Sequence, residues 1–336
     1  MGICQCCQYK DSVPRLRQKP LLSASKKGLR LNPRSWIGDS LQILSTKTLK
    51  SLTLPGTHDS GSYFLTDVPM EGDQSEFVET LYKLIPSFIK NRKNIFKNWA
   101  IAQHQPIYEQ LSSGARYLDI RAGWDNENKQ WVTYHFLIGK PISDLLSDIS
   151  NFLNENLSEI LIIEISHYRG SPSKENILEL KNLVFQYLEK FLLEKNISLN
   201  FTVGYMVGTG KRAIVSMVEI EDDLRIWPEL LIKNSYANTG KLQEMMDINE
   251  KKIGKSGKLE MIFKMSWTLT PGSDNIVKGI FKKPKNLIEL AKIANKSLGE
   301  FYHNKVKGKG RMGNILVFDY FNSDQIMEII WEMNDL

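Results

Sequence analysis

Near-continuous apolar runs constrain the fold of this chain more than any other feature. The runs Ile160–Ile163 and Ile315–Phe318 contain only large aliphatic and aromatic residues. Parallel strands covered on both faces have this composition, whereas strands with one solvated face alternate apolar and polar residues. Longer amphipathic stretches separate such runs along the chain. This alternation indicates an α/β fold built on a parallel sheet.

The number of these units favours a barrel over an open sheet. About eight strands in roughly 290 residues match a (β/α)8 barrel of the TIM type. We expect an irregular barrel, because the chain between Arg121 and Trp131 is too short to hold a helix. The expected strands are Ser51–Pro55, Ala115–Ala122, Trp131–Phe136, Glu159–Ser166, Arg212–Val218, Leu231–Ser235, Leu259–Trp267 and Asn314–Phe321, and the expected helices are Pro141–Asn156, Ser173–Glu194, Thr239–Lys252, Pro284–His303 and Ser323–Asn334.

Polar side chains stand at the ends of several expected strands. His58, Arg121, His135 and Asp319 each follow or close an apolar run. In a barrel the carboxyl ends of the strands meet at one mouth, so these residues should converge. Two imidazoles can take up one proton and release another, while a guanidinium binds a phosphate between them. This combination indicates phosphodiester cleavage.

Positive charge is concentrated at the amino terminus. Residues 1–34 hold eight Lys/Arg against one acid, a net charge of +7, and the remainder carries −1. A basic tail beside a near-neutral body indicates an anionic surface as partner. The aromatic platform of a nucleic-acid binder is missing, so we expect no nucleic acid as a partner. We also expect a monomeric protein. Residues 1–34 should be a basic tail, and residues 35–336 one catalytic domain.

The tail also resembles a lipid anchor. Gly2 would accept myristate after removal of Met1, and Cys4, Cys6 and Cys7 are candidates for palmitate, although Cys6 replaces the usual Ser/Thr. Two anchoring signals hold a protein on a membrane where one does not. With no signal peptide and no spanning segment, we expect peripheral attachment to the cytoplasmic face of a membrane. A zinc-binding or disordered start is the alternative.

Five segments together resemble the catalytic X region of the phosphatidylinositol-specific phospholipases C, in the compact form of the bacterial enzymes and of the trypanosome enzyme that cleaves glycosylphosphatidylinositol (GPI). The resemblance covers roughly residues 35–322. It implies a substrate among membrane inositol phospholipids or GPI lipids, with diacylglycerol and an inositol 1,2-cyclic phosphate as products. The matching segments are Trp36–Asp39, Leu54–Ser60, Gly114–Arg121, Tyr134–His135 and Ile315–Tyr320.

The resemblance also implies roles for individual residues. His58 would be the general base for the inositol 2-hydroxyl, with Asp319 holding its tautomer. Arg121 would bind the phosphate oxygens. His135, helped by Asp59, would protonate the leaving glycerol oxygen. Asp119, two residues before Arg121, would orient the network because both lie on one face of the strand.

No metal or other cofactor is expected. Larger eukaryotic relatives have acidic calcium ligands where Arg121 stands in this chain. A fixed guanidinium would replace the charge of the cation on the phosphate and would repel calcium. Asp59 stands where the calcium-dependent relatives have asparagine. The resemblance therefore implies a calcium-independent enzyme.

The residues expected to bind the head group match the family less closely. Tyr236 fits an aromatic that stacks on inositol, whereas Asn234 replaces an acid. An expected lysine is missing, and its place could be taken by His167 or Arg169. Further candidates at the mouth are Lys264 and Trp267.

Several alternatives stay open. The degraded head-group positions allow a catalytically silent lipid-binding protein. A glycerophosphodiesterase would need a Glu-x-Asp metal pair on the second strand, where this chain has Asp119 and Arg121. The basic amphipathic segment Phe77–Trp99 is equally compatible with a membrane-dipping segment and with a helix that faces the core.

Overall fold

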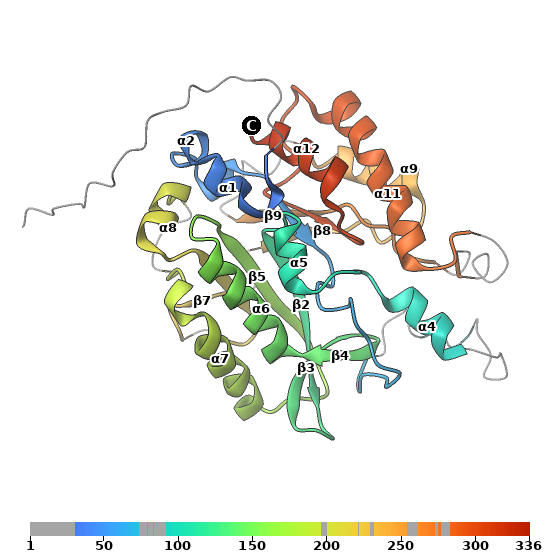
Figure 1. Cartoon of the computed structure of the whole chain (residues 1–336). Helices are drawn as coiled ribbons and strands as arrows, with labels where there is room; N and C mark the ends of the chain where they lie inside the picture. The colour runs from blue at the N-terminus through green and yellow to red at the C-terminus, as the bar shows by residue number, and fades with distance from the viewer. Residues whose placement is uncertain are drawn as a thin grey trace, which may run out of the picture. The chain divides into compact units, whose positions relative to one another are not determined.

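One curled sheet forms the centre of the domain (Figure 1). The computed structural model describes residues 31–73, 79, 83, 92–195, 200–220, 222–228, 232–253, 261–272, 275–276 and 283–336. Eight parallel strands follow the order β7-β6-β5-β2-β1-β10-β9-β8, and β3 and β4 extend from β2 as an antiparallel ribbon. The parallel strands are β1 Leu54–Thr57, β2 Tyr117–Asp125, β5 Leu161–Arg169, β6 Ala213–Met217, β7 Ile226–Pro228, β8 Ile232–Ser235, β9 Ile262–Ser266 and β10 Ile315–Phe318.

The helices follow the strands as in a TIM-type barrel, which confirms the expected fold class. The ribbon strands are β3 Gln130–His135 and β4 Leu137–Pro141. The longer helices are α4 Arg92–Ala100, α5 Ile107–Ser112, α6 Ile142–Glu155, α7 Lys174–Leu188, α8 Val203–Thr209, α9 Leu242–Glu250, α11 Leu287–Phe301 and α12 Ser323–Met333, and the shorter elements are η1 Pro33–Ser35, α1 Trp36–Asp39, α2 Leu41–Leu44, η2 Leu49–Ser51, η3 Glu189–Phe191 and the π-helical turn η6 Tyr302–Val306.

Apolar periodicity explains where the helices lie. In α6 the buried residues recur every three or four positions, from Ile142 to Leu153, so one stripe faces the sheet. That stripe joins α5, α7 and the outward faces of β2, β5 and β6 in a single core cluster. Ser173 starts α7 with a capping box to Asn176. Figure 1 shows α5, α6 and α7 along this face of the sheet.

Two strands escape the sequence pattern. β4 follows β3 after only Phe136, whose φ of 65° turns the chain without the usual glycine or asparagine. β7 has three residues, too few to show a period. The ribbon formed by β3 and β4 occupies the part of the chain where a helix is missing after Arg121.

Gly2, Cys4, Cys6 and Cys7 lie outside the described residues, as does most of the basic tail. Arg34 is described, and its guanidinium pairs with Glu155 of α6. In the segment Phe77–Trp99, the described helix α4 buries Phe96 and Trp99, which favours the core-facing alternative for that part. No described helix is long and apolar enough to span a bilayer.

Candidate active site

His58 and Asp319 meet because their strands are neighbours. β1 pairs with β10 in parallel, with Thr57 opposite Phe318, so the next residue of each strand leaves the sheet side by side. The Nδ1 atom of His58 lies 2.8 Å from an Asp319 carboxylate oxygen. A carboxylate at this distance holds the proton on Nδ1 and leaves Nε2 free to accept another. In its neutral form, His58 thus has the tautomer that a general base requires.

Gln103 holds these two strand ends together, although no sequence motif points to it. Its side-chain amide donates to the carbonyls of His58 (2.8 Å) and Phe318 (2.9 Å). Its side-chain oxygen accepts from the backbone N–H of Phe321 at 3.0 Å. Gln103 is buried at 1% exposure, in a segment without regular structure. No periodicity marks such a residue in the sequence.

Asp59 lies at the centre of the cluster. Its carboxylate pairs with Nε of Arg121 and lies 3.4 Å from Nε2 of His135 and 3.5 Å from Nδ1 of His58. The residue adopts a φ of 44°, which turns its side chain back into the barrel. Ser60 fixes this turn, since its hydroxyl accepts the N–H of Asp119 and its own N–H donates to the Asp119 carbonyl, both at 2.8 Å.

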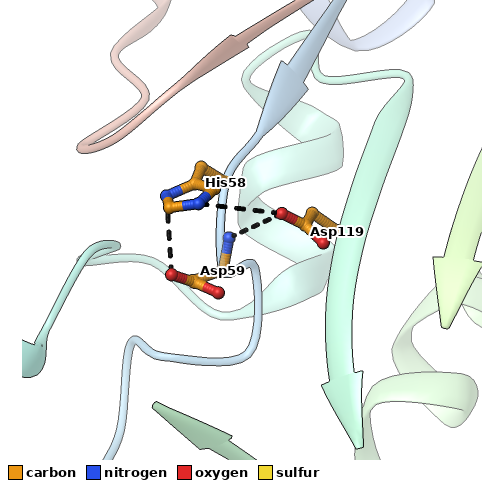
Figure 2. A group of neighbouring side chains, drawn as sticks. All are labelled: His58, Asp59 and Asp119. Carbon is orange, nitrogen blue, oxygen red and sulfur yellow. Dashed lines mark hydrogen bonds and ion pairs between the residues drawn. The ribbon is translucent and has the colours of Figure 1, made fainter. Parts of the chain in front are cut away.

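β2 supplies Asp119 and Arg121 from one face, as the strand alternation predicts. Asp119 lies 3.9 Å from Nε2 of His58 and 3.5 Å from the backbone nitrogen of Asp59. Figure 2 shows His58, Asp59 and Asp119 turned toward one another. Nη2 of Arg121 lies 3.4 Å from Nε2 of His58, and about a quarter of the Arg121 side chain stays exposed. An anion entering the mouth would therefore meet the guanidinium beside Nε2 of His58.

His135 faces Asp59 from the ribbon strand β3. Its Nδ1 lies 2.5 Å from the carbonyl oxygen of Ala100, so Nδ1 carries a proton and donates it. The other nitrogen, Nε2, is directed to the carboxylate of Asp59. Proton exchange with a ligand is thus confined to Nε2, the atom that faces the cluster.

The carboxylates set the charge state of this cluster. Burial alone would lower the pKa of His58, but the negative charges of Asp59, Asp319 and Asp119 outweigh it and raise the pKa to about 9. Burial would raise the pKa of Asp59, but the positive charges around it hold that pKa well below its usual range. These charges come from Arg121, His135, His58 and His167. The buried Asp59 therefore stays ionised, and its charge in turn raises the pKa of Arg121.

The space between these groups does not fit a calcium ion. One ligand atom from each of His58, Asp59 and Asp119 lies within 4.8 Å of the others. Calcium takes six to eight oxygen ligands, whereas this set offers one nitrogen and two carboxylates. The guanidinium of Arg121 already pairs with Asp59 and lies beside His58. A divalent cation would have to displace that charge.

Three of the expected head-group residues lie at the mouth. Tyr236 follows β8, is 42% exposed, and places its ring 6.3 Å from that of His58 at an interplanar angle of 26°. Its hydroxyl is hydrogen-bonded to Thr270. Asn234 is exposed on β8, and its side-chain oxygen accepts from Ser266 at 3.4 Å. His167 is exposed near the end of β5, with Nδ1 2.7 Å from the hydroxyl of Ser166.

Two of the other three candidates do not reach the mouth. Trp267 is fully buried against α11, where its indole N–H donates to the Ala294 carbonyl at 2.8 Å, so its placement at the mouth is wrong. Strand alternation explains this, because Lys264 and Ser266 face the barrel interior and Trp267 faces outward. Lys264 is buried at 5% exposure instead of reaching the mouth. Arg169, at the end of β5, donates to the carbonyl of Tyr168.

Lys264 belongs to a charged layer inside the barrel. Its ammonium lies 2.7 Å from Glu164 and 2.7 Å from the hydroxyl of Tyr117, which also bonds Glu164. Burial opposes ionisation of Asp119, but Lys264 and His58 lower the pKa of that carboxyl. The sequence did carry a signal for this layer, since Glu164 and Lys264 each interrupt an apolar strand.

Comparisons with known proteins agree with the motifs. The chain is 23% identical over 344 residues to the variant-surface-glycoprotein phospholipase C of Trypanosoma cruzi, covering 90% of this chain and 89% of that protein. It is 24% identical over 327 residues to PI-PLC X domain-containing protein 2 of Mus musculus, covering 94% and 92%. A PI-PLC X-box domain-containing protein of Dictyostelium discoideum is 29% identical over 185 residues, which are 55% of this chain and only 23% of that protein. No protein-family model matches the chain.

Solved structures show the same fold. The phosphatidylinositol-specific phospholipase C from Listeria monocytogenes matches with a TM-score of 0.63 and 18% identity, covering 89% of this chain and 98% of the other. A Staphylococcus aureus phosphatidylinositol-specific phospholipase C matches with a TM-score of 0.61 and 16% identity, covering 91% and 98%. The chain is therefore a relative of the PI-PLC X-domain proteins and has the barrel fold of the bacterial phosphatidylinositol-specific phospholipases C.

Proposed function

We propose that the protein is a phosphodiesterase that cleaves the glycerol–phosphate bond of phosphatidylinositol or GPI lipids. One observation carries this proposal: two imidazoles face the same Asp59–Arg121 ion pair, and each has its Nδ1 held by an acceptor. Both therefore exchange protons only through Nε2. The names of the relatives point to the same lipid class.

The first step forms a cyclic phosphate. Nε2 of His58 takes the proton of the inositol 2-hydroxyl as that oxygen bonds to phosphorus. Asp319 stabilises the resulting imidazolium through Nδ1. Arg121 balances the charge on the non-bridging oxygens, the role that calcium has in other enzymes of this chemistry.

The second proton goes to the leaving group. The bond between phosphorus and the glycerol oxygen breaks, and Nε2 of His135 protonates that oxygen to release diacylglycerol. A carboxylate oxygen of Asp59 lies 3.4 Å from this Nε2 atom and orients the imidazole. Water can then open the inositol 1,2-cyclic phosphate with the two histidines in exchanged roles.

A product assay tests this function directly. Phosphatidylinositol and GPI vesicles are incubated with the protein in the presence of a calcium chelator, and phosphorus NMR follows the products. Wild type should release inositol 1,2-cyclic phosphate, whereas His58→Ala and His135→Ala should each lose about 10²–10⁴-fold in rate. Vesicle binding without turnover of either lipid would support a silent lipid-binding protein, and activity that requires calcium would contradict the role of Arg121.

We also propose that the amino-terminal tail attaches the enzyme to the cytoplasmic face of an anionic membrane. Gly2 and Cys4, Cys6 and Cys7 supply acylation sites next to eight basic residues within residues 1–34. One acyl chain binds only marginally, so basic charge or a second chain is required. In cells, Gly2→Ala should move the protein from the membrane to the soluble fraction, and an unchanged distribution would argue against this anchor.

A further inference from the structure

A polar groove lies at the carboxyl end of β10, between α11 and the start of α12. Its volume is about 430 Å³. Among the described residues that line it, two are lysines and none carries a carboxylate. Such a lining favours an anion over a cation or an apolar ligand. The lining residues are Lys292, Asn295, Lys296, Tyr320, Asn322, Gln325 and Ile326.

The two lysines are arranged as a pair. Lys292 and Lys296 are four residues apart on α11, so their side chains share one face of the helix. Like charges at this spacing destabilise a helix. An anion bound between the two ammonium groups would offset this repulsion. The Lys292 ammonium is held 4.7 Å from the centre of the Tyr320 ring, a cation–π distance.

His104 brings a third nitrogen group to the same place. Its ring lies 4.2 Å from that of Tyr320. Burial lowers the pKa of His104, Lys292 lowers it further, and Glu109 opposes both. An anion bound at Lys292 would reverse that repulsion, so His104 offers a built-in reporter of occupancy.

The groove and the reaction centre are connected through the adjacent residues Tyr320 and Asp319. Tyr320 follows Asp319, whose carboxylate holds His58. The side-chain amide of Asn295 donates to the carbonyls of Asp319 at 3.0 Å and Tyr320 at 3.2 Å. The groove therefore opens at the same end of the sheet as His58, the end that a lipid substrate would approach.

We propose that this groove binds a phosphate monoester, as a second anion site beside the reaction centre. A monoester carries close to two negative charges, which match the two ammonium groups, and the side-chain amides of Gln325 and Asn322 add polar groups. The monoester could belong to a membrane lipid such as phosphatidic acid or to a soluble molecule such as glycerol 3-phosphate. Either source presents the same group to the lysines.

A vesicle assay with the full chain tests the lipid source. Vesicles of phosphatidylcholine contain either phosphatidic acid or an amount of phosphatidylglycerol that gives the same surface charge. Lys292→Gln/Lys296→Gln should bind phosphatidic acid vesicles about tenfold more weakly than wild type, with a smaller loss on phosphatidylglycerol. Lys190→Gln/Lys211→Gln is the matched control, because it removes the same charge at the amino ends of the strands. The basic tail is present in every variant and contributes equally.

A soluble arm tests the other source. Glycerol 3-phosphate is titrated while NMR follows the pKa of His104, which should rise in wild type and in the control variant but not in the groove variant. A response in the vesicle arm alone assigns a lipid, and one in the soluble arm alone assigns a free monoester. Lys292→Arg/Lys296→Arg should restore binding, which excludes misfolding as the cause. If the groove variant matches the control in both arms, the proposal is wrong.

Discussion

The floor of the barrel mouth and its rim are built differently. On the floor, Asp59, Asp119 and Asp319 are buried, and each contacts His58. On the rim, Tyr236 and His167 are exposed and extend from strand ends with few partners. A group that must transfer a proton needs fixed geometry, whereas a group that recognises a head group can vary.

The same contrast separates what matches the family from what departs from it. The residues proposed for catalysis match its motifs, and the structure brings all six of them together. Of the residues proposed for recognition, Tyr236 fits the family whereas Asn234 departs from it, and Trp267 and Lys264 do not reach the mouth. The floor should therefore respond to substitution with large losses in rate, and the rim with modest changes in affinity.

The largest effect is expected at Asp319. Asp319→Asn removes a charge that raises the pKa of His58, so that pKa should fall below about 9. Because His58 acts as a base, activity should rise with pH as His58 loses its proton. A lower pKa of His58 should therefore shift this rise to lower pH. The maximal rate should nevertheless fall, by up to about 10⁴-fold, since the amide no longer secures the Nδ1–H tautomer. The pH profile of kcat/KM measures both, and a profile with an unshifted midpoint would break the assignment of His58 as base.

A smaller loss is expected at Arg121. Arg121→Lys keeps the positive charge but loses the planar fork that pairs with Asp59 and lies beside His58. We expect a loss of about 10²–10³-fold in kcat. Arg169→Lys is the matched control, because that side chain bonds the Tyr168 carbonyl. Equal losses in the two variants would mean that Arg121 contributes no more to catalysis than Arg169. That result would contradict the distinction between floor and rim.

The smallest effect is expected on the rim. Tyr236→Ala removes an exposed ring that stacks near His58, so KM should rise about two- to tenfold while kcat changes little. Tyr236→Phe should behave like wild type, because the lost hydroxyl bonds Thr270. Steady-state kinetics on the lipid substrate separates kcat from KM. A large fall in kcat for Tyr236→Ala would show that Tyr236 acts in catalysis and not only in head-group binding.

Residues at strand ends were the easiest to place from the sequence. His58, Arg121 and Asp319 each follow an apolar run, and parallel strands bring such ends together. Gln103 and Ser60 could not be found this way, because they act through backbone hydrogen bonds that depend on neighbouring strands. Trp267 was placed wrongly because strand alternation turns its side chain outward. The sequence alone did not show which face of β9 points into the barrel.

By itself, the sequence determined the parallel α/β barrel, the gathering of two histidines and an arginine at one mouth, and the concentration of basic charge in residues 1–34. Periodicity and strand ends encode these features locally. Only the tertiary structure decided which nitrogen of each imidazole faces the cluster, that Lys264 is enclosed with Glu164, and that Lys292 lies over Tyr320. Those outcomes depend on contacts between segments far apart in the chain. No local hydrophobic pattern in the sequence predicts such contacts.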